Sequence, residues 1–161
     1  MKVRDIMTRD VVSCRADEDI ATAARLMLQG RFGTLPVLDP HGTVAGIVTD
    51  RDIAVAAGTR QRNASHITVH EAMSRRVRSC SMDDDIGAAL RQMTEQRVRR
   101  LPVLDQAQHL TGILSIDDIL LRALDQADGV SSADFVNALR RICSQPAIEP
   151  EFDVSETFVS G

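Results

Sequence analysis

The hydrophobic positions in the first half of the chain follow a helical period and then the shorter period of strands. One predicted helix face keeps the spacing i, i+3, i+4, i+7, i+8 with Ile20, Ala23, Ala24, Met27 and Leu28. A short strand is expected before this helix, near residues 11–14, and two apolar runs follow it at residues 35–39 and 44–49. Because Pro-His-Gly at residues 40–42 is favourable turn chemistry, the two runs are predicted to form a β-hairpin.

A second helix is predicted directly after the hairpin. It begins near residues 50–52, carries apolar side chains at Ile53, Val55 and Ala56, and is expected to end at Gly58, since glycine commonly terminates helices. The resulting order is strand, helix, hairpin, helix, a βαββα unit. A unit of roughly 50 to 60 residues buries too little surface to be secure alone, so a second copy is expected to pack against it.

The second half of the chain repeats the first. A shift of 66 positions aligns residues 5–53 with 71–119 without a gap, and 21 of these 49 pairs are identical. Identical segments include Ser-Cys at 13–14 and 79–80, and Leu-Pro-Val-Leu-Asp at 35–39 and 101–105. The helix face recurs as Ile86, Ala89, Leu90 and Met93. The chain is therefore predicted to contain a duplicated structural unit.

Acidic residues precede the first helix of each unit, at residues 17–19 and 83–85. Their side-chain oxygens can cap free backbone amides, and their negative charge is favourable at a helix N-terminus. This role explains the acidic residues without a metal ion. The four histidines lie in turns and in the linker without an i, i+4 pair or a carboxylate at ligand spacing, so no metal site is predicted.

Two longer motifs extend the repeat, Gly-Ile-Val-Thr-Asp-Arg-Asp-Ile at residues 46–53 and Gly-Ile-Leu-Ser-Ile-Asp-Asp-Ile at residues 112–119. Together with the preceding Met, Ser-Cys, acidic and Leu-Pro-Val-Leu-Asp positions, they resemble the cystathionine-beta-synthase (CBS) domain, in the tandem arrangement called a Bateman module. The resemblance covers residues 3–125. It implies an α/β (α+β) fold in which two βαββα repeats pack through their sheets with pseudo-two-fold symmetry. It also implies adenosine nucleotides bound in clefts between the repeats, frequent dimers, and regulation of other proteins without catalysis.

On this basis, the chain is divided into CBS repeat 1 (3–60), a linker (61–69), CBS repeat 2 (70–126), a C-terminal helix (131–145) and a partly disordered tail (146–161). The last helix can be capped by Ser131 or Ser132, and its predicted apolar stripe consists of Phe135, Val136, Leu139 and Ile142 with Cys143. It can pack on its own module, swap to a second subunit or dock a partner. Its sequence is similar to the ending of small two-repeat bacterial hypoxia-response proteins.

The junction between the second strand of each hairpin and the following helix is the candidate binding element. There, Thr49 with Asp52 and Ser115 with Asp118 lie where backbone amides face outward. A carboxylate accepts hydrogen bonds from both hydroxyls of a sugar diol, whereas it repels phosphate. The same aspartates can alternatively be helix caps only.

The residues just before the Leu-Pro-Val strands differ between the repeats. Arg-Phe-Gly-Thr stands at residues 31–34, and Arg-Val-Arg-Arg at residues 97–100. Residues at this place often reach nucleotide phosphates in the family, and the resemblance assigns that role to Arg99 and Arg100, because guanidinium groups match phosphate oxygens. Phosphorylated adenosine is therefore expected to bind more tightly beside Asp118. Taken alone, an arginine cluster is more often a solvated face.

The family's geometry also places the adenine of each site on the opening strand of the other repeat. This nominates Met7 and Val12 for the site of the second repeat, and Met73 and Arg78 for the site of the first. The expected regulatory ligand is AMP, ADP or ATP, and no cofactor is required.

Composition narrows the function classes. The net charge of −4 and the pI near 5.5 argue against nucleic-acid binding. The chain has no Trp or Tyr and only four Phe, so few aromatic side chains are available to stack on nucleic-acid bases. No apolar stretch approaches the roughly 20 residues of a membrane span, and residues 1–7 lack the apolar core of a signal peptide, so no membrane association and a cytoplasmic location are expected.

Catalytic chemistry is not expected either. No nucleophile stands in a motif with a base, and no phosphate loop or dinucleotide fingerprint occurs, so the chain is predicted not to be an enzyme. Cys14, Cys80 and Cys143 lack metal or redox spacing and are interpreted as reduced and mostly structural. One alternative is a Cys14–Cys143 disulfide under oxidation, if the final helix folds back on the first strand.

Three functional hypotheses remain from the sequence. The leading one is a sensor that binds an adenosine nucleotide and passes a conformational change to an effector protein. The family resemblance implies that such a sensor is a homodimer. The second is a ligand-free structural or stress-related module that serves dimerisation or interaction. The third is nucleic-acid binding through Arg75, Arg76, Arg97, Arg99 and Arg100.

Overall fold

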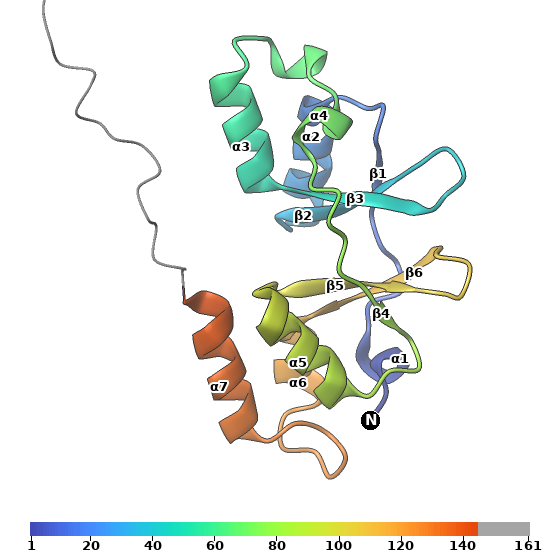
Figure 1. Ribbon diagram of the computed structural model, residues 1–161, viewed down its shortest axis with the longest axis vertical. Coiled ribbons are helices and arrows are strands. Elements are labelled where there is room, and N and C mark those ends of the chain that lie inside the picture. The colour runs from blue at the N-terminus through green and yellow to red at the C-terminus, as the bar shows by residue number, and fades with distance from the viewer. Residues whose placement is uncertain (145–161) are drawn as a thin grey trace, which may run out of the picture.

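Each half of the chain forms a three-stranded sheet, and the two sheets lie next to each other in the middle of the molecule (Figure 1). The computed structural model describes residues 1–144. The first sheet contains β1 (Cys14–Arg15), β2 (Thr34–Leu38) and β3 (Val44–Thr49). The second contains β4 (Cys80–Ser81), β5 (Arg100–Leu104) and β6 (Leu110–Ser115). In both, the short first strand is parallel to the middle strand and the hairpin is antiparallel. The predicted α/β fold of two repeats is confirmed.

The helices cover the outer faces of the two sheets (Figure 1). In chain order they are α1 (Val3–Ile6), α2 (Ile20–Gly30), α3 (Asp50–Thr59), the 3-10 turn η1 (Ala64–His66), α4 (Val69–Ala72), α5 (Ile86–Gln96), α6 (Ile116–Arg122) and α7 (Ser132–Cys143). The acidic caps are where the sequence predicts them: Asp19 accepts a hydrogen bond from the Thr22 amide and Asp85 from the Gly87 amide. Within residues 1–144, no helix is long and apolar enough to span a bilayer.

Several local predictions were wrong. Leu28, placed on the buried face of α2, is 79% exposed, and Leu26 packs partly against the core instead. Gly58 does not end its helix, because α3 continues to Thr59 and the cap is Arg60 in a right-handed conformation. The first strand begins at Cys14, at the end of the predicted segment, because only Cys14 and Arg15 pair with β2.

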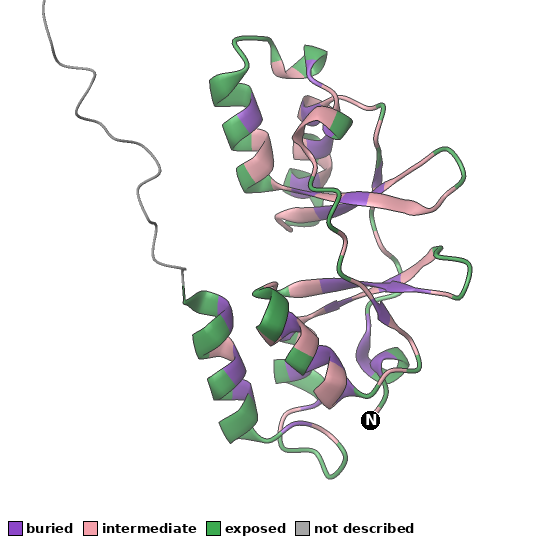
Figure 2. Ribbon diagram, viewed as in Figure 1, coloured by how far each residue is buried: buried purple, intermediate pink, exposed green. Residues whose placement is uncertain are grey.

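Each repeat contributes its N-terminal segment to the core of the other. Val3, Ile6 and Met7 belong to the hydrophobic core of the second repeat. Conversely, Ile67 and Val69, at the end of the predicted linker, are fully buried in the core of the first. Figure 2 shows the general pattern: helix faces turned toward the rest of the module are buried, and the outer faces are exposed. The chain therefore crosses from one repeat to the other twice, once after α1 and once after α4.

Glycine is required where these passing segments cross a sheet. A Cβ on Gly46 would lie 2.9 Å from the carbonyl oxygen of Ser74, and one on Gly112 would lie 3.0 Å from that of Thr8. These approaches are part of backbone bridges that join Ile47 to Ser74 and Thr8 to Ile113. The repeated Gly-Ile dipeptide thus allows the crossing segments to approach β3 and β6 closely.

Helix α7 packs on its own module, against α5. Phe135, Ala138 and Ile142 are buried and Leu139 is partly buried, whereas Val136 is 47% exposed. Val136 was therefore placed wrongly in the apolar stripe, and Ala138 takes its place. The predicted tail at residues 146–161 lies outside the described residues.

The position of α7 also contradicts the Cys14–Cys143 hypothesis. Cys14 is buried in the core of the first repeat, while Cys143 is exposed at the end of a helix that packs on the second. All three cysteines are free thiols. The final helix does not fold back on the first strand, so the condition for that disulfide is not met.

Candidate functional site

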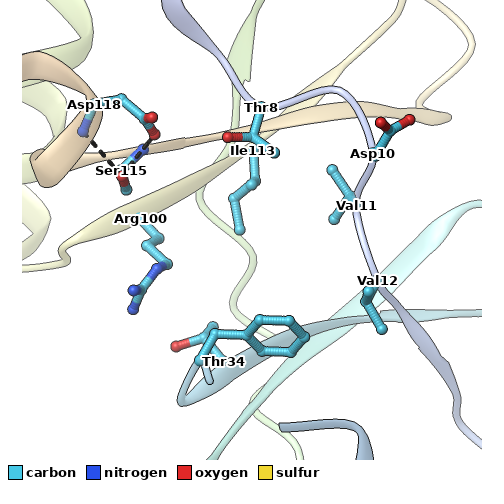
Figure 3. Close-up of a pocket in the computed structure, with 10 residues that line it drawn as sticks. Thr8, Asp10, Val11, Val12, Thr34, Arg100, Ile113, Ser115 and Asp118 are labelled. Atoms are coloured by element: carbon cyan, nitrogen blue, oxygen red, sulfur yellow. Dashed lines mark hydrogen bonds between the residues drawn. The ribbon is translucent and has the colours of Figure 1, made fainter. Parts of the chain in front are cut away.

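Two clefts lie between the repeats, one beside each predicted Thr/Ser–Asp pair. The Asp118 cleft, defined by Ser115 and Asp118, has a volume of about 210 Å³. Figure 3 shows Ser115 and Asp118 at one side of it and Asp10, Val11 and Val12 at the other, with Arg100 and Thr34 between them. The Asp118 cleft is thus built from both repeats, as the family resemblance implies.

The Asp52 cleft, defined by Thr49 and Asp52, has a volume of about 370 Å³. The segment that crosses after α4 supplies Ser74, Arg76 and Arg78 to its lining. The loop before β5 supplies Arg97, Val98 and Arg99, and β5 itself supplies its first residue, Arg100. This cleft is therefore related to the Asp118 cleft by the same 66-residue shift that relates the repeats.

Both Asp residues close a capping box on the helix that follows the hairpin. An Oδ2 atom accepts hydrogen bonds in each case: Asp118 from the Ser115 amide at 2.9 Å and hydroxyl at 2.6 Å, and Asp52 from the Thr49 amide at 2.9 Å and hydroxyl at 2.7 Å. The Ser115 and Thr49 hydroxyls in turn accept from the Asp amides. Both Asp residues therefore cap their helices, and each cap occupies one of the two carboxylate oxygens.

The other carboxylate oxygen differs between the clefts. Oδ1 of Asp118 lies 3.7 Å from Nη1 of Arg122, which also donates to the Ile6 carbonyl oxygen. The position equivalent to Arg122 in α3 is Ala56, a buried alanine, and in the described part of the chain Asp52 has no ion pair. Because one oxygen is fixed by the cap, the remaining oxygen of Asp52 is the acceptor available to a bound hydroxyl.

The arginines before β5 do not lie where the sequence analysis placed them. Arg99 lines the Asp52 cleft and is not part of the Asp118 cleft, while Arg100 lines both. The loop before β5 reaches across to the facing repeat, so the residues before one Leu-Pro-Val strand serve mainly the other repeat's cleft. The sequence pattern predicts that phosphorylated adenosine binds more tightly beside Asp118. That prediction assumes that Arg99 and Arg100 line the cleft of the repeat to which they belong.

The methionines nominated for adenine contact lie behind the clefts. Met7 is buried with its Sδ against Gly112, and Met73 packs in the same way against Gly46. Neither lines a cleft, whereas Val12 lines the Asp118 cleft and Arg78 lines the Asp52 cleft. The crossing segments are thus correctly located, but the methionine side chains point into the cores.

The clefts also contain lining residues that were not predicted, among them Asp10, Phe32, Thr34 and Arg76. Asp10 and Arg76 are equivalent in the repeat and sit two positions before Val12 and Arg78. Phe32 and Thr34 are equivalent to Val98 and Arg100. Applying the 66-residue shift to the predicted Arg100 would have found Thr34, whereas the other three are not equivalent to any predicted site residue.

Two of the three cysteines are buried away from the clefts. Burial raises the pKa of the Cys14 and Cys80 thiols to about 12, so both are protonated and inert at neutral pH. Neither cleft has a histidine or cysteine in its lining. Among residues 1–144, no three or more His, Cys, Asp or Glu side chains gather in a way that could hold a metal ion.

Comparison with known proteins defines the class of protein. The CBS domain family matches residues 3–58 and 69–125, and the chain belongs to this family. Over 130 residues it is 32% identical to the CBS domain-containing protein YhcV of Bacillus subtilis, covering 81% of this chain and 91% of that protein. It is also 37% identical to a homoserine O-acetyltransferase of Methanosphaerula palustris, over 73% of this chain but only 23% of the enzyme.

Solved structures of CBS pairs share the arrangement. The CBS domain pair of MJ0100, in complex with 5′-methylthioadenosine and S-adenosyl-L-methionine, is 26% identical with a TM-score of 0.68, covering 75% of this chain and 94% of that one. Hypoxic Response Protein I, with two coordinated zinc ions, is 28% identical with a TM-score of 0.69, covering 76% and 98%. The predicted kinship with hypoxia-response proteins is thereby confirmed as structural similarity.

Proposed function

We propose that this chain is a non-catalytic regulatory module that binds an adenosine-containing nucleotide between its CBS repeats and passes a conformational change to a partner protein. The observation that carries the proposal is the pair of related clefts, each with a hydroxyl and a carboxylate held at a strand-to-helix junction. Such a carboxylate suits the diol of a ribose. The adenosine compounds bound by the CBS pair of MJ0100 support the same ligand class.

The placement of the clefts suggests how ligand binding reaches a partner. Each cleft is lined by both repeats and by a crossing segment, so a ligand contacts parts of the chain that belong to different cores. A ligand shifts a conformational equilibrium only by its differential affinity for the two states. A ligand that bridges the repeats favours the arrangement in which both repeats contact it. We propose that the partner protein recognises this arrangement.

A thermal-unfolding panel with AMP, ADP, ATP, S-adenosylmethionine and 5′-methylthioadenosine tests the proposal. A ligand at 100 times its dissociation constant adds about 2.7 kcal/mol to the stability of the folded state. The variants Asp52→Asn and Asp118→Asn keep an oxygen for the cap but convert the second oxygen into a donor. We expect the ligand-induced shift to fall in at least one of them.

The matched control is Asp117→Asn, an exposed residue beside Asp118 that lies outside both clefts. It should keep the full shift. If none of the five compounds raises the melting temperature of the unmodified protein, the nucleotide proposal fails.

A second candidate function, a dimerisation or interaction module, has its own supporting observation. Val55 on α3 and Leu121 on α6 are equivalent in the repeat and are 56% and 78% exposed. Exposed apolar side chains at matched positions are typical of association surfaces when they gather into a patch. Size-exclusion chromatography with light scattering measures the oligomeric state of the wild type and of the double variant Val55→Glu with Leu121→Glu. A dimeric wild type and a monomeric double variant support this candidate function. A monomeric wild type contradicts it.

A further inference from the structure

Five arginines line the Asp52 cleft, together with the carboxylate of Asp52. They are Arg76, Arg78, Arg97, Arg99 and Arg100. Two come from the crossing segment after α4, and three from the loop that ends α5 and begins β5. In a chain whose net charge is −4, this is a local reversal of sign.

None of these five arginines has a carboxylate within ion-pair distance among residues 1–144. Other arginines do find such partners, for example Arg15 with Asp17 at 2.9 Å and Arg60 with Glu71 at 3.1 Å. Nη2 of Arg99 donates a hydrogen bond to an uncharged group outside the cluster, Sγ of Cys143, at 3.4 Å. Like charges held together without counter-charges oppose folding, so an anion that binds among them is stabilised by all of them.

The Asp118 cleft has the opposite balance at equivalent positions. A 66-residue shift replaces Arg76 with Asp10 and Arg78 with Val12, and Arg99 with Gly33. Of its lining residues, Asp10 and Asp118 are acidic and only Arg100 is basic. The volume is also smaller, about 210 Å³ against about 370 Å³. A phosphate chain placed here would meet two carboxylates and one guanidinium.

We infer that the two clefts select different ligands: the Asp52 cleft binds an adenosine di- or triphosphate through its arginines, and the Asp118 cleft binds an adenosine compound that carries no phosphate. The inference rests on the proposed function for the adenosine part, and on the arginine cluster alone for the phosphates. Guanidinium groups bind phosphate oxygens in pairs of parallel hydrogen bonds, whereas a carboxylate accepts sugar hydroxyls and repels phosphate. Charge, and not the shared frame, therefore sets the specificity of each cleft.

Isothermal titration calorimetry with ATP, adenosine and inorganic tripolyphosphate tests the inference on the full chain. The variant Arg78→Gln with Arg99→Gln changes two exposed side chains. We expect it to weaken ATP and tripolyphosphate binding by about 10- to 100-fold for each guanidinium removed, because each makes charge-assisted hydrogen bonds to phosphate. Adenosine affinity should change less than about 3-fold. The control Arg140→Gln with Arg141→Gln removes the same two positive charges from an exposed part of α7 and should bind ATP like the wild type.

A transplant variant tests the other cleft. Asp10→Arg with Val12→Arg gives the Asp118 cleft the residue types found at the equivalent positions of the other cleft, and both side chains are exposed. We expect this variant to bind a second ATP, while the wild type binds one. Since nothing is removed from a core, a gain of binding is not confused with a loss of folding.

The possible outcomes separate the two proposals. If adenosine and ATP bind but the arginine variant binds ATP as tightly as the wild type, the inference is overturned while the proposed function stands. If no adenosine compound binds, the proposed function fails, and the tripolyphosphate titration then tests the inference. Tripolyphosphate binding to the wild type that is lost in the arginine variant supports an anion site in the Asp52 cleft. No tripolyphosphate binding to the wild type overturns the inference.

Discussion

Thr49 with Asp52 and Ser115 with Asp118 form the same capping box, with hydroxyl-to-carboxylate distances of 2.7 and 2.6 Å. Around these pairs, however, one cleft has five arginines and the other has one. The backbone positions that hold the box are fixed by packing and pairing, which the duplication kept in both repeats. The lining side chains project from crossing segments and loop ends, where packing places few demands on them. The difference shows that duplication conserves a frame while its two sites become chemically distinct.

The cysteines give the largest expected contrast. Cys14 and Cys80 are equivalent, buried, and have a pKa raised to about 12 by burial, whereas Cys143 is exposed on α7. We expect a thiol reagent at neutral pH to modify Cys143 in the folded protein at least ~10²-fold faster than the other two, because the thiolate is the reacting form. Peptide mapping after timed labelling measures the three rates.

Labelling in denaturant is the control for this contrast, since all three thiols should then react at similar rates. Equal rates in the folded protein would mean that the cores of the two repeats open readily. Fast labelling of only one of the buried pair would show that the two cores are not equally closed.

Helix α7 covers only the second repeat, and removing its main anchor tests how much that asymmetry contributes to stability. Phe135 is 4% exposed within the core that includes α5, so Phe135→Ala should lower the free energy of unfolding by about 3–5 kcal/mol. Urea denaturation measures the change. The control Val136→Ala removes a half-exposed neighbour on the same helix and should cost less than about 1 kcal/mol. Equal effects of the two variants would contradict the packing of α7 on α5.

The helices, the strands and most buried positions of the two repeats could be predicted from the sequence, because their hydrophobic patterns are periodic and occur twice. Ile20 and Ile86, Leu35 and Leu101 are fully buried at equivalent positions, and the hairpin strands pair in equivalent registers. Leu28 shows the limit of this reasoning. Its helical spacing is right, but no element within residues 1–144 covers α2 at that position. Periodicity alone carries no information about which helix faces are covered.

The assignment of Arg99 to a cleft could not be predicted from spacing within its own repeat. The loop before β5 reaches the facing repeat because the two sheets pack against each other, and this crossing is a property of the tertiary arrangement. Met7 and Met73 illustrate the same limit. They lie on the crossing segments that line the clefts, but the alternation of the backbone turns their side chains toward Gly112 and Gly46 in the cores.

Removing the hydroxyl of each capping box tests whether the two frames are energetically equivalent. The Thr49 and Ser115 hydroxyls each accept a hydrogen bond from an Asp amide at a helix N-terminus. We expect Thr49→Ala and Ser115→Ala to cost about 1 kcal/mol each, within the range of 0.5–2 kcal/mol for lost caps. The swaps Thr49→Ser and Ser115→Thr keep the hydroxyl and should stay close to wild type. A cost confined to one repeat would mean that the equivalent geometry does not have equivalent energy.

The smallest expected effect concerns the short helix that begins each repeat. In α4 the carboxylate of Glu71 accepts hydrogen bonds from the amide and hydroxyl of Thr68 and pairs with Arg60 and Arg62. The backbone hydrogen bond from Thr68, followed by the bond from Arg62, lowers the pKa of Glu71 to about 2. The equivalent residue in α1 is Asp5, whose carboxylate accepts one hydrogen bond from the backbone amide of Lys2. Among residues 1–144, Asp5 has no arginine partner.

The sign of the pH effect follows from this lowered pKa. A carboxyl whose pKa is lower in the folded state than the ordinary value near 4.3 binds its proton less readily when folded, so it stabilises the folded state above that value. The contribution is lost as the pH falls from about 4.5 towards about 2. We expect Glu71→Gln to lower stability at neutral pH by a small amount, because the group is exposed and screened by solvent, and to flatten the fall in stability below pH 4.5. Arg62→Gln, which keeps the cap but removes one ion pair, should produce part of the same change in urea denaturation followed across pH. If both variants keep the acid dependence of the wild type, the arginine pairs do not distinguish α4 from α1 in energy, and the two helix starts are equivalent in spite of their different partners.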